Sequence, residues 1–436
     1  MEKPHNTGNL LFIIFWWIVQ HVNIRWAHKL LYWGLRDGSF PSGHCSDTRL
    51  GIDLWGHHFT TPIGLAAGVD KRGNTLDTLM QMGYSFGTFG PYTLEKEMPS
   101  QEKFFFKQDR AIVTQCNGYR NPGLEKMLPW FVKRRYLPHY IGMDIAIPAE
   151  SEESNIKRGR HFSYLDEFIL MSQRVAPYCD FVTLDFSHPN AELSVLIVDA
   201  ATIVPIVTAV KETVKRAAPI HPPKIFIKIP LDLTTVEIPM VGQVILNSGA
   251  DGVIVAGPLS FAKNSRLKLQ GAKEHQLAGQ VIGQPTHHAV TELIRQLYPL
   301  LKDRVPIIAT GGVFNGKDAF DFISAGASMV ALDESSLIFE GPGVLHKVDK
   351  ELGEILHQRN FDSITKAIGL GAQVTPQQMP VMKQPQSATV TTPGAQATPN
   401  VPVTSQPISQ TPVAQQQTPA EPSGQETDQG TPNTTL

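Results

Sequence analysis

The sequence predicts an α/β fold, a (β/α)8 TIM barrel, for the middle of this 436-residue chain. Eight short apolar, β-rich runs recur between about residues 50 and 365. Helical patterns, with apolar residues at three- and four-residue spacing, separate most of these runs. Eight strands in such alternation are typical of the barrel, and an open doubly wound sheet is the alternative.

The expected strands are the runs 63–67, 86–89, 141–145, 181–185, 225–229, 252–256, 306–309 and 329–332. The clearest helical patterns between them are 203–217, 236–247, 289–301 and 318–325. In such a barrel, functional side chains gather where the strands end, and phosphate sites commonly follow strands seven and eight.

The two ends of the chain differ from its middle. Residues 10–22 form a dense apolar run, shorter than the roughly 20 residues that span a bilayer, with tryptophans in and after it. A secretory signal is the alternative, but Glu2 and the lack of a small-residue cleavage site weigh against it. We therefore expect residues 1–45 to form a membrane anchor and amphipathic helices, followed by the barrel at 46–368.

Residues 369–436 are expected to be a disordered tail. From about residue 374 the chain is rich in Pro, Gln, Thr and Ser and has no aromatic residue. Such a segment cannot bury enough apolar area to offset its chain entropy. Its sequence does not indicate a partner.

Composition excludes some classes of function. A net charge of -2 and a pI near 6.7 offer no electrostatic footprint for nucleic acid. The three cysteines are widely spaced, which indicates reduced thiols, and no metal-ligand spacing appears, so no metal site is expected.

The end of the first expected strand is the most informative local pattern. Ala67 and Gly68 are small enough for a flat ligand to lie against the backbone, and Lys71 suits an anionic ligand. An ordinary strand-to-helix turn with a solvated lysine is the alternative.

Three later strand ends also carry polar groups. After the fourth strand, a turn that includes Asp185 and His188 could orient a polar ligand and move a proton. Lys228 ends the fifth strand and must reach the barrel mouth or find a partner, because an unpaired buried lysine is costly. After the seventh strand, Gly311 and Gly312 precede a helix expected to start near residues 315–318, where backbone N–H groups can cradle a phosphate.

These motifs together resemble the membrane-linked, quinone-reducing class of dihydroorotate dehydrogenases. The similar segments lie within about residues 23–368 and are 27–30 (AHKL), 65–71 (LAAGVDK), 187–190 (SHPN), 227–229 (IKI), 277–279 (LAG), 305–313 (VPIIATGGV) and 325–328 (AGAS). The resemblance implies an FMN-containing barrel that oxidises dihydroorotate to orotate in pyrimidine synthesis and passes two electrons to ubiquinone. It also implies attachment to the mitochondrial inner membrane, although no clear transit sequence precedes the apolar run.

The resemblance also assigns roles to individual residues. Lys71 would face both flavin and substrate, and Lys228 would lie near the flavin N1, where a reduced flavin gathers negative charge. Asn190 would hold the pyrimidine ring by its amide and carbonyl edges. The positions expected against the flavin or its phosphate are Ala67, Gly68, Gly279, Gly311 and Gly312.

The chain departs from the family pattern at several site positions. His188 stands where this class has a serine as catalytic base, and imidazole is a competent base near neutral pH. Family asparagines that bind flavin or substrate correspond to Gln115, Asp144, Asp185 and Gly257. The Tyr-Thr pair that receives the FMN phosphate corresponds to Asp333 and Glu334.

Charge decides what these departures imply. A like-charge pair at 4 Å costs about 4 kcal/mol at an effective dielectric constant of 20. Asp333 and Glu334 would face a phosphate dianion, so FMN is expected to bind weakly or not at all. Two hypotheses follow. The chain is either a working dihydroorotate dehydrogenase with His188 as base, or a catalytically impaired relative that serves as a membrane-associated scaffold or regulatory partner.

Overall fold

The computed structural model describes residues 24–38, 40, 42–116, 118–132, 139–148, 163–188, 192–264 and 267–372. The apolar run at 10–22 and all but the first four residues of the expected tail lie outside these residues. The predictions of a membrane anchor and of a disordered tail are therefore not tested by the structure.

Eight parallel strands close into a barrel in the order in which they occur in the chain. They are β3 (Ile63–Leu65), β4 (Phe86–Tyr92), β7 (Tyr140–Ala146), β8 (Phe181–Asp185), β9 (Lys224–Ile229), β10 (Gly252–Val255), β13 (Ile307–Thr310) and β14 (Met329–Leu332). Pairing of β14 with β3 closes the ring, with Val330 opposite Ile63. The prediction of a barrel is confirmed, and the alternative of an open sheet is wrong.

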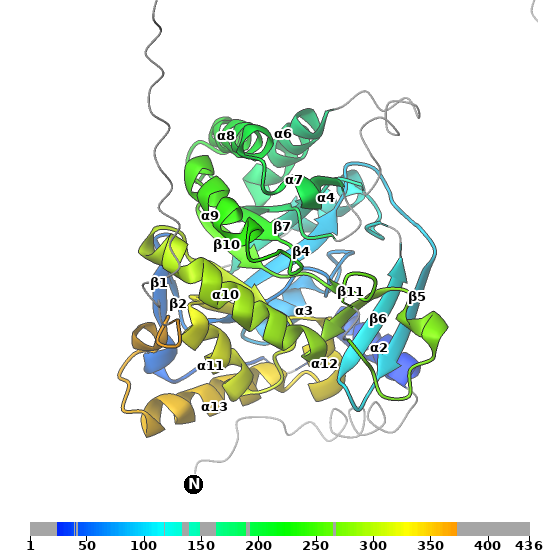
Figure 1. The fold of residues 1–436 in the computed structure, drawn as a ribbon, viewed down its shortest axis with the longest axis vertical. Coiled ribbons are helices and arrows are strands. Elements are labelled where there is room, and N and C mark those ends of the chain that lie inside the picture. Colours follow the sequence, from blue (N-terminus) through cyan, green and yellow to red (C-terminus); the bar gives the residue numbers. More distant parts are fainter. Residues whose placement is uncertain are drawn as a thin grey trace, which may run out of the picture. The chain divides into compact units, whose positions relative to one another are not determined.

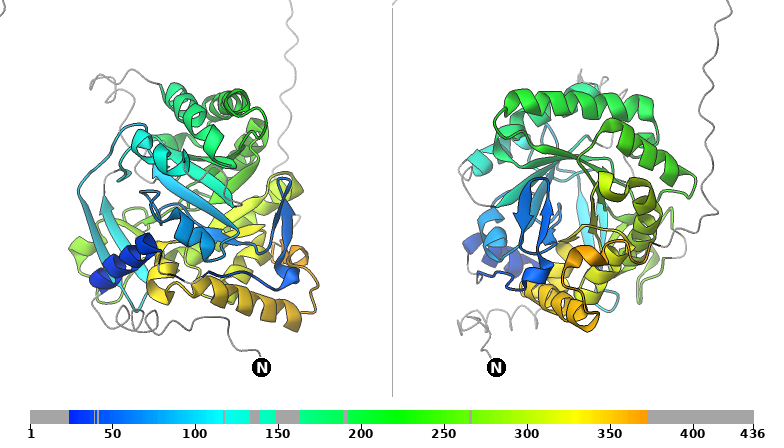
Figure 2. Two further views of the ribbon diagram at one scale, coloured as in Figure 1. Left: turned by 180° about the vertical axis from the view of Figure 1, so that it is seen from behind. Right: turned by 90° about the vertical axis from the view of Figure 1, so that its left-hand side faces the viewer.

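Helices surround the strands, as Figure 2 shows. They are α3 (Leu76–Gln81), α4 (Leu124–Val132), α6 (Tyr164–Val175), α7 (Glu192–Leu196), α8 (Ala200–Ala217), α9 (Glu237–Ser248), α10 (His287–Leu301), α11 (Gly316–Ala325), α12 (Glu334–Glu340) and α13 (Val344–Gln358). In α8, the predicted apolar stripe of Ile203, Val207, Val210 and Val214 is buried. The side chain of Asn315 caps α11 by accepting from the N–H of Asp318, so this helix begins where the sequence predicted.

A second sheet lies beside the barrel and was not predicted (Figure 1). Its four antiparallel strands are β5 (Gln101–Phe106), β6 (Ala111–Cys116), β12 (Gln280–Gly283) and β11 (Leu259–Ser260). Two of them come from the connection between β4 and β7, and two from the connection between β10 and β13. Segments more than a hundred residues apart therefore meet over the carboxyl ends of the barrel strands.

An aromatic hairpin closes the opposite end of the barrel. The strands β1 (Ile52–Leu54) and β2 (His57–Phe59) pair antiparallel, and Trp55 occupies their turn. The Trp55 ring lies 4.7 Å from that of Phe226, and its indole N–H donates to the carbonyl of Asp251 at 2.8 Å. Tyr140 and Phe181, at the starts of β7 and β8, complete this cluster with ring centroids 5.6 Å apart.

The helix α2 (Ile24–Asp37) precedes the barrel. Leu31 and Leu35 are buried on one side of the helix, whereas Trp26 and Trp33 are about 60% exposed (60% and 59%). None of the helices in the described part of the chain is long and apolar enough to span a membrane.

Candidate functional site

A cavity opens at the carboxyl ends of the barrel strands and is covered on one side by the second sheet. Its volume is about 1180 Å³, part of which is open to solvent. Of the predicted site residues, those that line it are Ala67, Gly68, Lys71, Asp144, Asp185, His188, Lys228, Gly257, Gly311, Asp333 and Glu334. The fold therefore brings together residues that are separated by more than 250 positions in the sequence, at the end of the barrel where function is expected.

Small residues make room for a ligand along one wall of the cavity. Ala66 and Gly68 follow β3, Ala256 and Gly257 follow β10, and Ala331 lies in β14. Gly257 has a φ of +128°, and a Cβ there would lie 3.3 Å from the Cβ of Ser187. A larger side chain at this position would be strained and would narrow the cavity.

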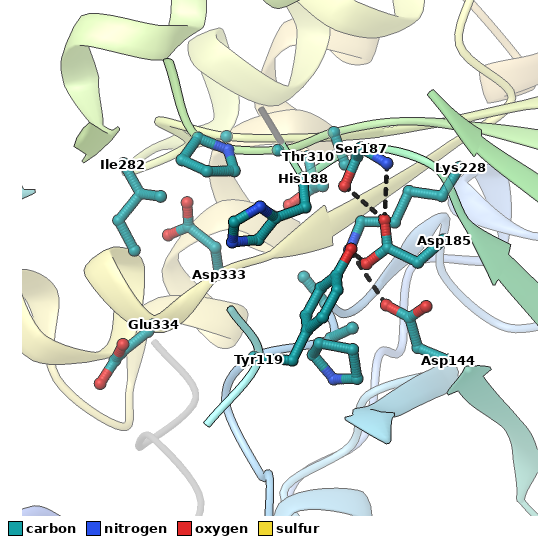
Figure 3. Close-up of a pocket in the computed structure, with 18 of the residues that line it drawn as sticks. Tyr119, Asp144, Asp185, Ser187, His188, Lys228, Ile282, Thr310, Asp333 and Glu334 are labelled. Carbon is teal, nitrogen blue, oxygen red and sulfur yellow. Dashed lines mark hydrogen bonds and ion pairs between the residues drawn. The ribbon is translucent and has the colours of Figure 1, made fainter. Parts of the chain in front are cut away.

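A buried lysine and two carboxylates occupy the floor of the cavity. The Nζ of Lys228, in β9, lies 3.0 Å from Asp144 Oδ2 and 2.9 Å from Asp185 Oδ2 (Figure 3). Adjacent parallel strands place these groups together, since Lys228 pairs with Asp185 in the barrel register. The N–H and the hydroxyl of Ser187 donate to the other oxygen of Asp185 at 2.7 and 2.6 Å. The sequence predicted that Lys228 would either reach the barrel mouth or find a partner. The structure shows both, because Lys228 lines the cavity and contacts two carboxyl groups.

The pKa values of the two carboxyl groups are shifted in opposite directions. Burial raises the pKa of Asp144 to about 8, although the charge of Lys228 opposes it. Burial acts in the same direction on Asp185, but Lys228 and the hydrogen bonds from Ser187 outweigh it and lower that pKa. Asp144 therefore holds a proton more strongly than Asp185, which stays the ionised partner of Lys228.

His188 lies between this group and the opposite wall of the cavity in the view of Figure 3. The side chain is 7% exposed, and its ring centroid lies 4.8 Å from that of Tyr119. Burial lowers the pKa of His188 to about 4, although the charge of Asp185 opposes the shift. The imidazole is neutral at neutral pH and so is able to accept a proton, but it is a weaker base than an ordinary histidine.

Lys71 reaches the cavity from a rigid turn. The carboxylate of Asp70 accepts hydrogen bonds from the N–H groups of Arg72, Gly73 and Thr75 at 2.7–2.9 Å. Burial, aided by the charge of Lys103, lowers the pKa of Lys71. Lys71 forms no ion pair with any residue that the structure describes.

The predicted phosphate end of the cavity is filled by carboxylates that already have partners. Asp333 caps α12, accepting from the N–H groups of Ser335 at 2.9 Å and Ser336 at 3.1 Å. Glu334 binds the Nζ of Lys103, in β5, through both oxygens at 2.7 Å. Burial raises the pKa of Asp333, although its hydrogen bonds with Ser335 and Ser336 oppose the shift.

Three predicted site residues that the structure describes do not line this cavity. Gln115 and Gly279 lie instead along a neighbouring groove, and Gln115 donates to the carbonyl of His275. Gly312 packs against β12, where a Cβ would lie 2.6 Å from the carbonyl oxygen of Gly283. Asn190 lies outside the described residues.

The second sheet explains the placement of Gln115. Side chains alternate along a strand, so Thr114 and Cys116 face the cavity while Gln115 faces away from it. The same strands supply cavity residues that the sequence analysis missed, among them Lys103, Gln280 and Ile282. The alternating pattern within residues 101–106 and 111–116 would have suggested strands, but not their position over the barrel.

The cavity does not fit FMN at its phosphate end. Asp333 takes the backbone donors at the start of α12, and Glu334 takes the nearest lysine, Lys103. A phosphate there would meet two carboxylates, and the lysine and the helix N–H groups that contact those carboxylates already have them as partners. No group of three or more ligating side chains that could hold a metal ion occurs among the described residues.

Comparison with known proteins identifies relatives over most of the chain. Residues 49–356 match the family described as dihydroorotate dehydrogenase. A dihydroorotate dehydrogenase (quinone) from Rhodospirillum rubrum is 28% identical over 79% of this chain and 90% of its own length. One from Coxiella burnetii is 30% identical over 68% of this chain and 82% of its own length. The ligand-free crystal structure of the Eimeria tenella enzyme superposes with a TM-score of 0.70 at 27% identity, over 81% of this chain and all (100%) of the other.

Proposed function

The chain belongs to the dihydroorotate dehydrogenase family, in its quinone class, and from that premise we propose that it keeps the family's barrel and cavity but has lost FMN-dependent oxidation of dihydroorotate. It would then act through binding, as a membrane-associated scaffold or regulatory partner. Its parts would be the N-terminal segment 1–45, the barrel 46–368 and the tail 369–436.

The main support for this proposal is the set of hydrogen bonds that Asp333 accepts. Its carboxylate already satisfies two N–H groups at the start of α12, at 2.9 and 3.1 Å. A phosphate competing for them would have to expel a side chain that is only 9% exposed. It would also approach Glu334, whose charge is already neutralised by Lys103. Repulsion between the phosphate and the Asp333 carboxylate would cost about 4 kcal/mol at a separation of about 4 Å and an effective dielectric constant of 20, which corresponds to roughly a thousandfold loss of affinity.

The floor of the cavity disfavours an anionic substrate for a similar reason. Lys228 lies at the floor of the cavity, and both of its close partners are carboxyl groups of the protein. Dihydroorotate carries a carboxylate, so it would lie near Asp185, which stays ionised because Lys228 and Ser187 lower its pKa.

The second candidate is a working dihydroorotate dehydrogenase that uses FMN and ubiquinone. The convergence of Lys71, His188 and Lys228 in one cavity favours it. His188 would accept the substrate proton as a neutral imidazole, and Lys71, which has no ion-pair partner among the described residues, would bind the substrate carboxylate. In this candidate, orotate would be the product.

The proposed membrane attachment is supported by α2. Trp26, Lys29, Trp33 and Arg36 follow helical spacing and are exposed, as expected for a helix lying on a lipid surface. Lys29 lies over the ring of Trp26, 4.7 Å from its centroid. A mouse relative is named as mitochondrial, and by analogy we propose the mitochondrial inner membrane as the location.

The test is to purify the full-length chain in detergent and measure its visible absorption, its FMN content and dihydroorotate-dependent ubiquinone reduction. We expect a colourless protein without this activity. The double variant Asp333→Tyr/Glu334→Thr should bind FMN at least tenfold more tightly, since this needs only about 1.4 kcal/mol of relieved repulsion.

A matched control removes two carboxylates far from the cavity by the same substitutions, Asp362→Tyr/Glu354→Thr. These side chains are 72% and 57% exposed, and FMN affinity should not change. One FMN per chain in the unmodified protein, together with ubiquinone reduction, would establish the second candidate instead.

A further inference from the structure

Lys71 differs from the other two lysines that line the cavity. The Nζ of Lys103 lies 2.7 Å from Glu334, and that of Lys228 lies 2.9 Å from Asp185. The side chain of Lys71 makes neither an ion pair nor a hydrogen bond with any residue in the described part of the chain. A molecule in the cavity therefore meets, at Lys71, an amine that the described side chains do not hold.

The turn that carries Lys71 explains why the adjacent acid does not neutralise it. The Oδ1 of Asp70 accepts from the N–H groups of Arg72 and Gly73 at 2.8 and 2.7 Å. Its Oδ2 accepts from the N–H and the hydroxyl of Thr75 at 2.9 and 2.8 Å. Both oxygens of this carboxylate are thus used to hold the turn, which presents Lys71 to the cavity from a rigid base.

The surroundings of Lys71 favour its neutral form. Burial lowers the pKa of this lysine, and the charges of Lys103 and Lys228 act in the same direction. The charges of Glu334 and of an ionised Cys116 oppose the shift without reversing it. A lysine that is desolvated and lies near other cations loses its proton more readily than usual, and the neutral amine is a nucleophile.

The cavity leaves room for a small molecule beside this amine. Gly68, three residues before Lys71, has a φ of +103°, and a Cβ there would have no other atom within 4 Å. Ala66 and Ala67 line the cavity next to it. The carboxyl groups that also line the cavity disfavour an anion, so the space suits a small uncharged molecule.

We propose that Lys71 forms a Schiff base, so that the cavity binds a small, uncharged aldehyde or ketone covalently and reversibly. The neutral Nζ attacks the carbonyl carbon and forms a C–N bond. The carbonyl oxygen then leaves as water together with the two protons of the nitrogen. One amine and one carbonyl thus give one imine and one water, and no oxidant or reductant is needed.

His188 provides a group that can relay these protons. It lines the same cavity and lies close enough to Lys71 for the charge of the lysine to act on its own pKa, which is lowered to about 4, mainly by burial. The neutral imidazole can therefore accept a proton from the attacking nitrogen and pass it to the departing oxygen. This inference goes beyond the proposed function, because imine formation involves neither FMN nor dihydroorotate.

The experiment traps the imine by reduction. The detergent-solubilised full-length chain is incubated at neutral pH with propanal and sodium cyanoborohydride, and peptide mass mapping follows the propylation of each lysine with time. Lys71 should be modified at least tenfold faster than Lys350, whose side chain is 69% exposed. The rate at Lys71 should also reach half of its maximum at a lower pH than the rate of Nα-acetyl-lysine amide.

The variant Lys103→Met tests the effect of the neighbouring cation. It removes a positive charge and leaves Glu334 able to pair with Lys71, so propylation of Lys71 should slow at least fivefold. Lys347→Met is the matched control, because Lys347 also lies 2.7 Å from a glutamate of α12, Glu340, but does not line the cavity. In this control the rate at Lys71 should stay within twofold of that in the unmodified chain.

Two results would overturn the inference: propylation of Lys71 no faster than that of Lys350, or an unchanged rate at Lys71 in Lys103→Met. The first comparison is made within the unmodified chain, so it does not depend on the folding of a variant. Bound FMN is measured separately, by visible absorption. Failure of the proposed function and failure of this inference are therefore distinguishable.

Discussion

The two ends of the barrel are formed by the same eight strands, but aromatic rings fill one end and charged side chains line the other. At the amino end, the rings of Trp55, Phe226 and Phe181 pack at centroid distances of 4.7 Å. At the carboxyl end, only two residues further along β9, Lys228 contacts two buried carboxyl groups. Phe226 and Lys228 both point into the barrel, because side chains alternate along a strand.

This difference indicates that the amino end of the barrel mainly stabilises the fold, whereas the carboxyl end provides the ligand site. Aromatic packing at the amino end removes apolar surface from water without burying charge. At the carboxyl end, desolvation of four carboxyl groups and three lysines offsets much of their mutual attraction. An arrangement of this kind is expected at a ligand site rather than at a site kept for stability.

The largest effect is expected from Phe226→Ala at the amino end. Phe226 is fully buried (0% exposed), and loss of the ring should lower the free energy of unfolding by about 3–5 kcal/mol. Urea unfolding measures this loss, and Phe226→Leu serves as a control that should lose less. A loss below about 1 kcal/mol would show that the aromatic end is not the stabilising one.

Lys228→Met makes the corresponding change at the carboxyl end. It leaves Asp144 and Asp185 buried without their cation, which should lower the free energy of unfolding by about 3 kcal/mol at pH 8. The added substitution Asp144→Asn should recover part of this loss, and a double-mutant cycle by urea unfolding measures the coupling. Full additivity of the two substitutions would contradict the ion-pair geometry.

The pH dependence of stability compares one acid at each end. Burial raises the pKa of Asp144 to about 8 and that of Asp349, in α13, to about 7. Each folded carboxyl holds its proton above the unfolded pKa, which is near 4, so each lowers stability as pH rises from about 4 to its folded pKa. The slope for one group is at most about 1.4 kcal/mol per pH unit.

His188 acts with the opposite sign. Its folded pKa of about 4 lies below the unfolded value, so its contribution rises with pH until about 6.5. Chemical unfolding from pH 5 to 8 should therefore show the steepest decline between about pH 6.5 and 7, where both acids act and His188 no longer opposes them. Asp349→Asn should flatten the part below pH 7, and Asp144→Asn should flatten the decline up to pH 8. A decline between pH 6.5 and 8 that neither substitution reduces would contradict these assignments.

The smallest effect on stability is expected outside both ends, at α2. The double variant Trp26→Ser/Trp33→Ser changes exposed rings, so the free energy of unfolding should change by less than about 0.5 kcal/mol. Binding to vesicles that contain anionic lipid should nevertheless weaken, as measured by co-sedimentation. Unchanged sedimentation would show that α2 does not contribute to the proposed membrane contact.

The sequence determined the barrel and much of its cavity. Each barrel strand appears as a local apolar run, because a strand buried on both faces needs one. Lys71, Asp185, His188 and Lys228 were found because they lie in or directly after those strands, and parallel strands end at one edge. The local sequence pattern and the position after a strand were therefore sufficient to identify these four residues as site residues.

Only the tertiary structure shows which partners the charged side chains of the cavity have. The second sheet joins strands from two distant connections, so neither Lys103 beside Glu334 nor the outward direction of Gln115 could be read from spacing. The sequence suggested that Asp333 would repel a phosphate, whereas the fold shows its carboxylate bonded to the start of α12. Hydrogen bonds and ion pairs depend on distances of about 3 Å between groups far apart in the chain, and a linear pattern does not carry such distances.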